Sequence, residues 1–194
     1  MLAEDNHSTI MVTGYNGIKG PKADPTIMGS NVSYLSQNCE MPILVIKDAR
    51  RRSSKVDGLY HYGVCYDGSD LSKSALKKAL AMMSSEDSLT TITVYEPGLD
   101  DDKIEEYVNG LRKEAQHVGK YQHICLDHEI AVTVYNTIKN YLKAQNNSSS
   151  DYIDWICIGN VGRGYEAHQN KIGSLANACL RAKRMNVLFI PKSL

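Results

Sequence analysis

Strand-like and helix-like segments alternate along most of this chain, and that alternation constrains its fold more than any other feature. Five short apolar or β-branched runs predict strands, at residues 59–66, 89–95, 123–126, 152–158 and 187–190. Between them lie four segments with apolar residues at helical spacing, at residues 71–83, 100–118, 130–144 and 173–183. Parallel strands need helical crossovers, which cover the faces of the sheet. We therefore predict an α/β fold with a doubly wound, parallel, five-stranded sheet of Rossmann-like organisation.

The start of the chain carries a shorter version of the same pattern. A strand at 8–13, a glycine-rich loop, a helix beginning near Pro25 and a strand at 43–46 give β-loop-α-β, which is too little to form a core alone. Its register matches the end of the chain, because five residues each lie 144 positions before an identical one: Gly29, Ser30, Met41, Leu44 and Ile46 precede Gly173, Ser174, Met185, Leu188 and Ile190. We interpret this agreement as a duplicated unit. The prediction is a partial repeat over residues 1–48, an exposed linker over 49–57 and a complete domain over 58–194.

Two sequence features fall where ligands bind in such sheets, outside the carboxyl ends of the strands at the point where strand order reverses. Asp67 follows the first strand of the complete domain. The fourth strand runs into Gly159-x-x-Gly162, and a polar loop leads on to Gly173-Ser174 at the start of a helix. Glycines let the backbone approach a phosphate closely, and a helix N-terminus directs unpaired N–H groups at it. A carboxylate able to bind a sugar hydroxyl or an adenine amino group thus faces a phosphate cradle, which predicts a nucleotide site.

The chain resembles the universal stress protein family in these residues, in Gly68-Ser69 after Asp67 and in its final apolar strand. The resemblance covers residues 59–192 as one domain and residues 10–47 as the last third of another. It implies the adenine nucleotide alpha hydrolase-like fold, a stress-response or signalling role, and ATP or AMP as ligand, with or without Mg2+. By position it implies ribose or adenine contacts from Asp67, a base contact from Val94, and phosphate contacts from Gly159, Gly162, Gly173 and Ser174. The family's nucleotide-binding branch has nine residues between the second glycine and the Gly-Ser pair, whereas ten separate Gly162 from Gly173 here.

Other interpretations of the same residues remain open. Asp67 is also a suitable N-cap for the helix that follows, Arg163 can pair with a phosphate or stay in solvent, and a glycine loop is often only a turn. A chain can keep this fold without its ligand, so the alternative function is an interaction or dimerisation module. No clear general base or nucleophile is present in the sequence. We therefore expect no catalytic residue and, at most, slow ATP hydrolysis.

The partial repeat has the glycines of a cradle, Gly14-x-x-Gly17 and Gly29-Ser30, but lacks the strand and the Asp-Gly-Ser that would form the other side of a pocket. We predict that it binds no nucleotide. Proteins of the resembled family typically dimerise by pairing their last strands. Residues 43–46 and 187–190 are therefore expected to pair inside one chain as a pseudo-dimer, or else to mediate a homodimer, which would cover an exposed sheet edge.

Composition argues against several classes of partner. Twenty-two basic residues balance twenty-two acidic ones, so no net charge attracts nucleic acid or a membrane surface. No segment reaches the roughly 18 apolar residues of a membrane span. The five cysteines include no CxxC pair and have no metal-ligand spacing with the histidines. We expect buried, reduced thiols, no metal site and a cytoplasmic location.

Overall fold

The computed structural model describes most of the chain. The described residues are 10–16, 28–47, 59–95, 101–116, 118, 120–127, 134–147, 153–161, 172–182 and 185–192.

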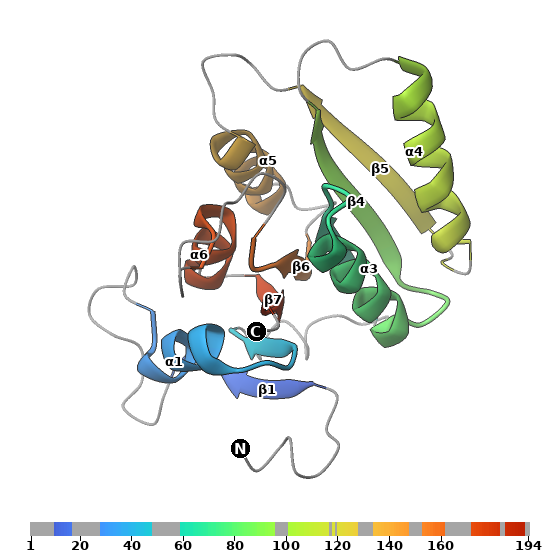
Figure 1. Ribbon diagram of the computed structural model, residues 1–194. Helices are drawn as coiled ribbons and strands as arrows, with labels where there is room; N and C mark the ends of the chain where they lie inside the picture. Colours follow the sequence, from blue (N-terminus) through green and yellow to red (C-terminus); the bar gives the residue numbers. More distant parts are fainter. Residues whose placement is uncertain are drawn as a thin grey trace.

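Seven strands form one sheet in the described part of the chain (Figure 1). In chain order they are β1 (Met11–Gly14), β2 (Ile43–Ile46), β3 (His61–Cys65), β4 (Ser88–Tyr95), β5 (Lys120–Asp127), β6 (Trp155–Gly159) and β7 (Asn186–Ile190). Their order across the sheet is β1-β2-β7-β6-β3-β4-β5, and every neighbouring pair is parallel except β2 and β7. The predicted α/β class is confirmed, and the sheet is parallel as predicted except between β2 and β7. The sheet is wider than the five strands predicted, because β2 pairs with β7 and brings β1 with it.

Helices cover both faces of this sheet (Figure 1). They are α1 (Ser30–Asn38), α3 (Asp70–Met82), α4 (Asp101–Glu114), α5 (Val134–Asn147) and α6 (Ser174–Arg181). Side chains of α1, α5 and α6 share one buried cluster, and those of α3 and α4 share another. Successive strand residues alternate between the two clusters, since Ile156 belongs to the first and Cys157 to the second. The sheet is therefore doubly wound.

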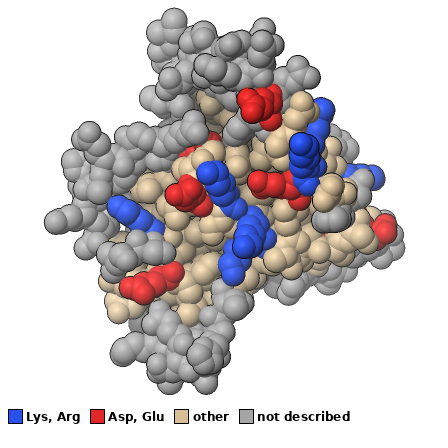
Figure 2. All heavy atoms as spheres, turned by 45° about the vertical axis from the view of Figure 1, so that its right-hand side comes forward, with Lys and Arg blue, Asp and Glu red and all other residues tan. Residues whose placement is uncertain are grey.

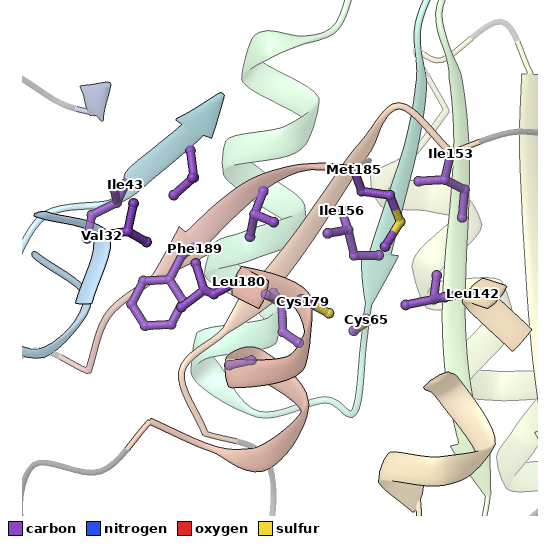
Figure 3. Close-up of a cluster of buried hydrophobic side chains, with 14 of the residues drawn as sticks. Val32, Ile43, Cys65, Leu142, Ile153, Ile156, Cys179, Leu180, Met185 and Phe189 are labelled. Atoms are coloured by element: carbon purple, nitrogen blue, oxygen red, sulfur yellow. The ribbon is translucent and has the colours of Figure 1, made fainter. Parts of the chain in front are cut away.

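The N-terminal elements pack into the same core as the rest of the chain. Val32 of α1 and Ile43 of β2 belong to the buried cluster that contains Leu180 of α6 and Phe189 of β7, and Figure 3 shows these side chains together. The register of β2 on β7 places Ile43 opposite Phe189. Full burial of one such side chain contributes about 1.5–3 kcal/mol. The β2–β7 contact is thus part of the core rather than a surface contact.

Several element boundaries differ from the sequence prediction. The strand β5 is eight residues long rather than the four predicted at 123–126, because it pairs with β4 along its whole length, including the exposed Lys120 and Gln122. The helix α1 begins at Ser30 after its N-cap Gly29, not near Pro25. The helix α4 ends at Glu114, four residues before Val118. Strand pairing and helix capping determine where these elements begin and end more than the pattern of apolar residues does.

All five cysteines are free thiols, and four of them are buried: Cys39, Cys65, Cys157 and Cys179. The prediction of burial is wrong for Cys125, which is exposed. Cys125 lies in an apolar run, but among the described strands β5 is at the edge of the sheet, with β4 as its one neighbour. An edge strand can leave such a side chain in solvent.

Basic and acidic side chains are interspersed on the face shown in Figure 2, with Lys and Arg lying among Asp and Glu. This mixture agrees with the balanced composition of the chain. It gives this face no broad field of one sign to attract a polyanion.

Candidate functional site

The order of strands reverses between β3 and β6. The chain moves outward from β3 through β4 and β5, and then returns to β6 on the other side of β3. The helices that follow these two strands lie on opposite faces, α3 over one and α6 over the other. Sheets of this kind bind ligands in the crevice that this divergence leaves at the carboxyl ends of the two strands.

Asp67 stabilises the turn between β3 and α3. Its Oδ1 accepts hydrogen bonds from the backbone N–H of Ser69 at 3.0 Å and from the Ser69 hydroxyl at 2.6 Å. Gly68 between them has φ of 77°, a left-handed conformation that favours glycine. Ser69, rather than Asp67, is the N-cap of α3, because its Oγ accepts from the Ser72 N–H at 3.3 Å. The half-buried Asp67 carboxylate is therefore positioned by its own turn.

Gly159 is the point at which the first turn of α3 touches the sheet. A Cβ atom at Gly159 would lie 2.7 Å from Cβ of Leu71. Real Cβ atoms essentially never approach so closely. Helix-on-sheet packing alone therefore requires glycine here, and it brings the N-terminus of α3 to the end of β6.

Asn160 connects the end of β6 to the start of α6. Its N–H donates to the Ile190 carbonyl at 2.8 Å, while its carbonyl and its Oδ1 accept from the Gly173 N–H at 3.0 and 3.3 Å. A Cβ atom on Gly173 would collide with that carbonyl oxygen. Gly173 caps α6 without a side-chain hydrogen bond, and the first turn of α6 contains no acidic residue. The partial positive charge of this helix end is thus not neutralised by the helix's own side chains.

Val94 lies near the carboxyl end of β4, the strand that pairs with β3. The register places Cys65 at the end of β3 opposite Ile92, so Val94 lies two residues further along β4. Val94 is partly buried and packs against the core cluster of α5 and α6. The Thr93 hydroxyl donates to the Tyr66 carbonyl at 2.9 Å, which ties β4 to the chain leading into Asp67.

The structure places most of the predicted site residues at one edge of the sheet. Gly173 contacts Asn160, the residue after Gly159, and Ser174 is exposed at the first position of α6. Asp67 follows β3, and Val94 lies near the carboxyl end of the neighbouring strand β4. Gly162, like Arg163, lies outside the described residues. Sequence reasoning missed Asn160, although its place inside Gly159-x-x-Gly162 was a signal that could have identified it.

Lys47, directly after β2, holds the opposite end of α6. Its Nζ donates to the carbonyls of Cys179 at 2.6 Å and Ala182 at 2.7 Å, and it lies 5.1 Å from the ring centroid of Tyr15. Burial lowers the pKa of this lysine to about 7. The Cys179 carbonyl also accepts from the Ala182 N–H at 3.2 Å, so Lys47 adds a second donor to it. An amine at a helix C-terminus can donate to carbonyls of the last turn in this way. The N-terminal segment therefore binds the C-terminal end of α6. This contact was not predicted from the sequence, because a single lysine after a strand is not a recognisable motif.

Within the described ranges, no group of three or more His, Cys, Asp or Glu side chains is arranged to hold a metal ion. No helix among the same residues is long and apolar enough to cross a membrane.

No protein-family model and no curated protein matches the sequence. Solved structures match its fold. A universal stress protein from Archaeoglobus fulgidus aligns with a TM-score of 0.67 at 18% identity, over 98% of this chain and 65% of its own. A putative universal stress protein from Pseudomonas aeruginosa gives 0.60 at 14% identity, over 98% and 66%. Universal stress protein UspA from Lactobacillus plantarum gives 0.50 at 18% identity, over 68% of this chain and 97% of its own.

The protein therefore has the fold of the universal stress proteins, as the sequence resemblance implies. The chain spans about two thirds of the length of the Archaeoglobus and Pseudomonas proteins. Because both of these align with 98% of this chain, the arrangement that includes its N-terminal segment has a counterpart in each of them.

Proposed function

We propose that the protein binds an adenine nucleotide, ATP or AMP, between Asp67 and the N-terminus of α6, and acts in stress response or signalling. One observation carries the proposal: the end of β6, the first turn of α3 and the N-cap of α6 meet at Gly159 and Asn160. The N-termini of α3 and α6 thus approach one point at the carboxyl end of β6. The N-terminus of α3 carries Asp70 in its first turn, whereas α6 has no acid there, so the N-terminus of α6 is the one that attracts an anion.

Each part of a nucleotide would find a suitable group around this point. Phosphates fit the N-terminus of α6, which has glycine at its N-cap, an exposed Ser174 and no acid in its first turn. A ribose or an adenine amino group can donate to the carboxylate of Asp67. The base can pack on Val94, which is only partly buried. A Mg2+ ion, where ATP brings one, would be held mainly by the phosphates, as is usual for this ion.

The proposed consequence of binding is a shift in stability rather than rapid turnover. A ligand that binds only the folded state at a hundred times its Kd adds about 2.7 kcal/mol to the free energy of unfolding. Cytoplasmic ATP could set the stability or the assembly of the chain in this way, and a partner would recognise that state.

A matched pair of substitutions tests the site. Ser174→Asp places a carboxylate at the proposed phosphate position, whereas Ser30→Asp makes the same change at the first position of α1, 144 residues earlier. Both serines are exposed and both helices lack an acid in the first turn, so neither change should disturb folding. With millimolar ATP and magnesium in a thermal-shift assay, wild type and Ser30→Asp should be stabilised, and Ser174→Asp should not. Equal shifts for all three chains would place the ligand elsewhere.

One observation favours the alternative function, an interaction or dimerisation module without nucleotide. Asp67 Oδ1 accepts two hydrogen bonds from Ser69, so the carboxylate already has a structural role in its own turn. The same thermal-shift assay distinguishes the two functions. If millimolar ATP does not stabilise the wild-type chain, the nucleotide proposal is wrong and the interaction module is the function that remains.

A further inference from the structure

We propose that β1 and the sheet face beside it are a docking surface for a strand–turn–helix segment of a second polypeptide. The surface comprises the outer edge of β1 together with Val12, Gly14, Leu44 and Ile46, on the sheet face opposite α1. Among the described residues β1 pairs with β2 alone (Figure 1). Its sequence, MVTG, has no charged residue of the kind that protects an exposed strand edge.

The other half of the chain shows what such a surface accommodates. The pair β1–β2 corresponds to β6–β7, because Gly14 lies opposite Ile46 as Gly159 lies opposite Ile190, in two parallel ladders of the same register. In the complete half, β3 adds to the outer edge of β6 in parallel, with Val64 opposite Cys157. The position on β1 that corresponds to Cys157 is Val12.

Coverage by a helix distinguishes these two positions. Cys157 is completely buried in the cluster beneath α3, whereas Val12 is 63% exposed. Leu44 and Ile46 of β2 are only partly buried, while Leu188 and Ile190 at the corresponding positions of β7 are buried. An apolar stripe that α3 helps to cover in one half is therefore open in the other.

A second, independent observation comes from the glycines that end the two strands. A side chain at Gly159 would collide with Leu71 of α3, so glycine is required there. At Gly14 the only neighbour of an added Cβ atom is the Asn16 carbonyl at 3.5 Å, an ordinary contact. Within the described chain nothing requires glycine at this position. A helix that approaches Gly14 as α3 approaches Gly159 would require it.

These observations select one occupant. A second copy of the chain, pairing β1 with β1, would extend the sheet but bring no helix over Val12 and Gly14. The occupant is instead an apolar strand that adds parallel to β1, followed by a tight turn and a helix with small residues on its inner face. In this chain β3 and α3 have that form, with Ala75 and Ala79 buried on α3. The partner is therefore a polypeptide with a strand–turn–helix unit of the same type.

The experiment uses the full chain and a synthetic peptide of its residues 59–83, which carries the β3 strand, the turn and the α3 helix. The peptide bears a fluorophore, and a photo-reactive group replaces Val64. We expect saturable binding with a cross-link to Val12 or its neighbours on β1. Val12→Lys should weaken binding about tenfold or more, since it places a charge on the apolar stripe.

Gly14→Ala is the sharper variant. It should leave thermal stability unchanged, because space exists for the Cβ atom, and yet weaken peptide binding as Val12→Lys does. A cross-link to β6 or β4 would mean exchange with the chain's own β3 and would overturn the proposal. So would an absence of binding, or a dimer of the chain alone that Val12→Lys dissociates. Unchanged binding by Gly14→Ala would show that no helix packs over this glycine and would overturn the proposed mode.

Discussion

The segments β1-α1-β2 and β6-α6-β7 have nearly the same local structure in very different surroundings. Each helix is capped by a glycine of extended conformation, with φ and ψ of −58° and 143° at Gly29 and of −56° and 150° at Gly173. In each, a Cβ atom on that glycine would collide with the carbonyl of the residue just after the strand, Tyr15 or Asn160. In each, the N–H of that residue donates to the last residue of the partner strand, Ile46 or Ile190. Local sequence is therefore sufficient to build a cradle twice.

The surroundings decide what each cradle can do. The second is flanked by β3 and by the first turn of α3, which carry Asp67 and the second helix N-terminus to its rim. The described residues supply no such neighbours to the first. A nucleotide site needs both parts, so we predict that a nucleotide binds at the second cradle and not at the first.

The contact between the two segments is itself almost symmetric. The strands β2 and β7 pair about Leu44 opposite Leu188, two residues that are 144 positions apart. The symmetry fails at Lys47, whose N–H donates to Asn186 Oδ1 at 2.9 Å. The corresponding residues 144 positions away are Pro191 and Pro42, and proline has no N–H to donate. The amine of Lys47 donates to carbonyls of α6, whereas Pro191, 144 positions later, has no amine with which to make the equivalent contact.

The largest expected effect comes from the core at this contact. Phe189→Ala should lower the free energy of unfolding by about 3–5 kcal/mol, because Phe189 is completely buried. Val45→Ala, at the equivalent position of β2, should cost less because fewer buried atoms are removed. Urea unfolding of both variants measures the difference. A negligible cost at Val45 would show that β2 adds little to the common core.

The two cap glycines should be about equally sensitive. Gly29→Ala and Gly173→Ala each force a methyl group against a backbone carbonyl, which cannot move as a flexible side chain can. We expect each to lose about 1–3 kcal/mol in thermal or urea unfolding. Loss in only one variant would contradict the equivalence of the two cradles.

Lys47→Met tests the contact at which the symmetry fails. The quantity to compare is the pH dependence of the free energy of unfolding in wild type and variant. The pKa of Lys47 is about 7 in the folded chain and about 10.5 in the unfolded chain, so between these values the unfolded chain binds one more proton. The stability of wild type relative to the variant should therefore rise with pH from about 7 to about 10, by at most about 1.4 kcal/mol per unit, and stay level below 7.

Cys179 and Tyr15, which lie beside Lys47, are not expected to change charge between about pH 7 and about pH 9. Burial raises the pKa of Cys179 to about 12 and raises that of Tyr15 above its usual value. Urea unfolding at several pH values, from about 6 to about 9, measures the difference. A difference that does not change with pH would mean that Lys47 stays charged when folded.

The smallest expected effect is the gain from an acid at each helix start without ligand. Ser30→Asp and Ser174→Asp should each add about 0.3–1 kcal/mol at low ionic strength, because the carboxylate complements the helix dipole. The two gains should be similar and should shrink in salt. A gain at only one of the two serines would contradict the equivalence of the two helix starts.

Some elements could be predicted from the sequence and others could not. The bounds of β2 agreed with prediction to the residue, and those of α3 nearly so, because a short apolar run and a capped periodic segment each carry their own signal. Prediction was poor for β5, whose length depends on β4, and for Cys125, whose exposure depends on edge position. Asp67 follows the strand β3 as predicted, but its hydrogen bonds to Ser69 depend on the conformation of a turn that could not be predicted from the sequence.

By itself the sequence determined the alternation of strands and helices, the fold class, and the position of each glycine cradle at the end of a strand. These follow from periodicity and glycine placement, which act over a few residues. Only the tertiary structure decided that Gly159 is pressed by Leu71, that Asn160 joins β6 to α6, and that Lys47 holds the far end of α6. Such contacts join residues far apart in the chain, and their geometry is fixed only when the whole sheet has assembled.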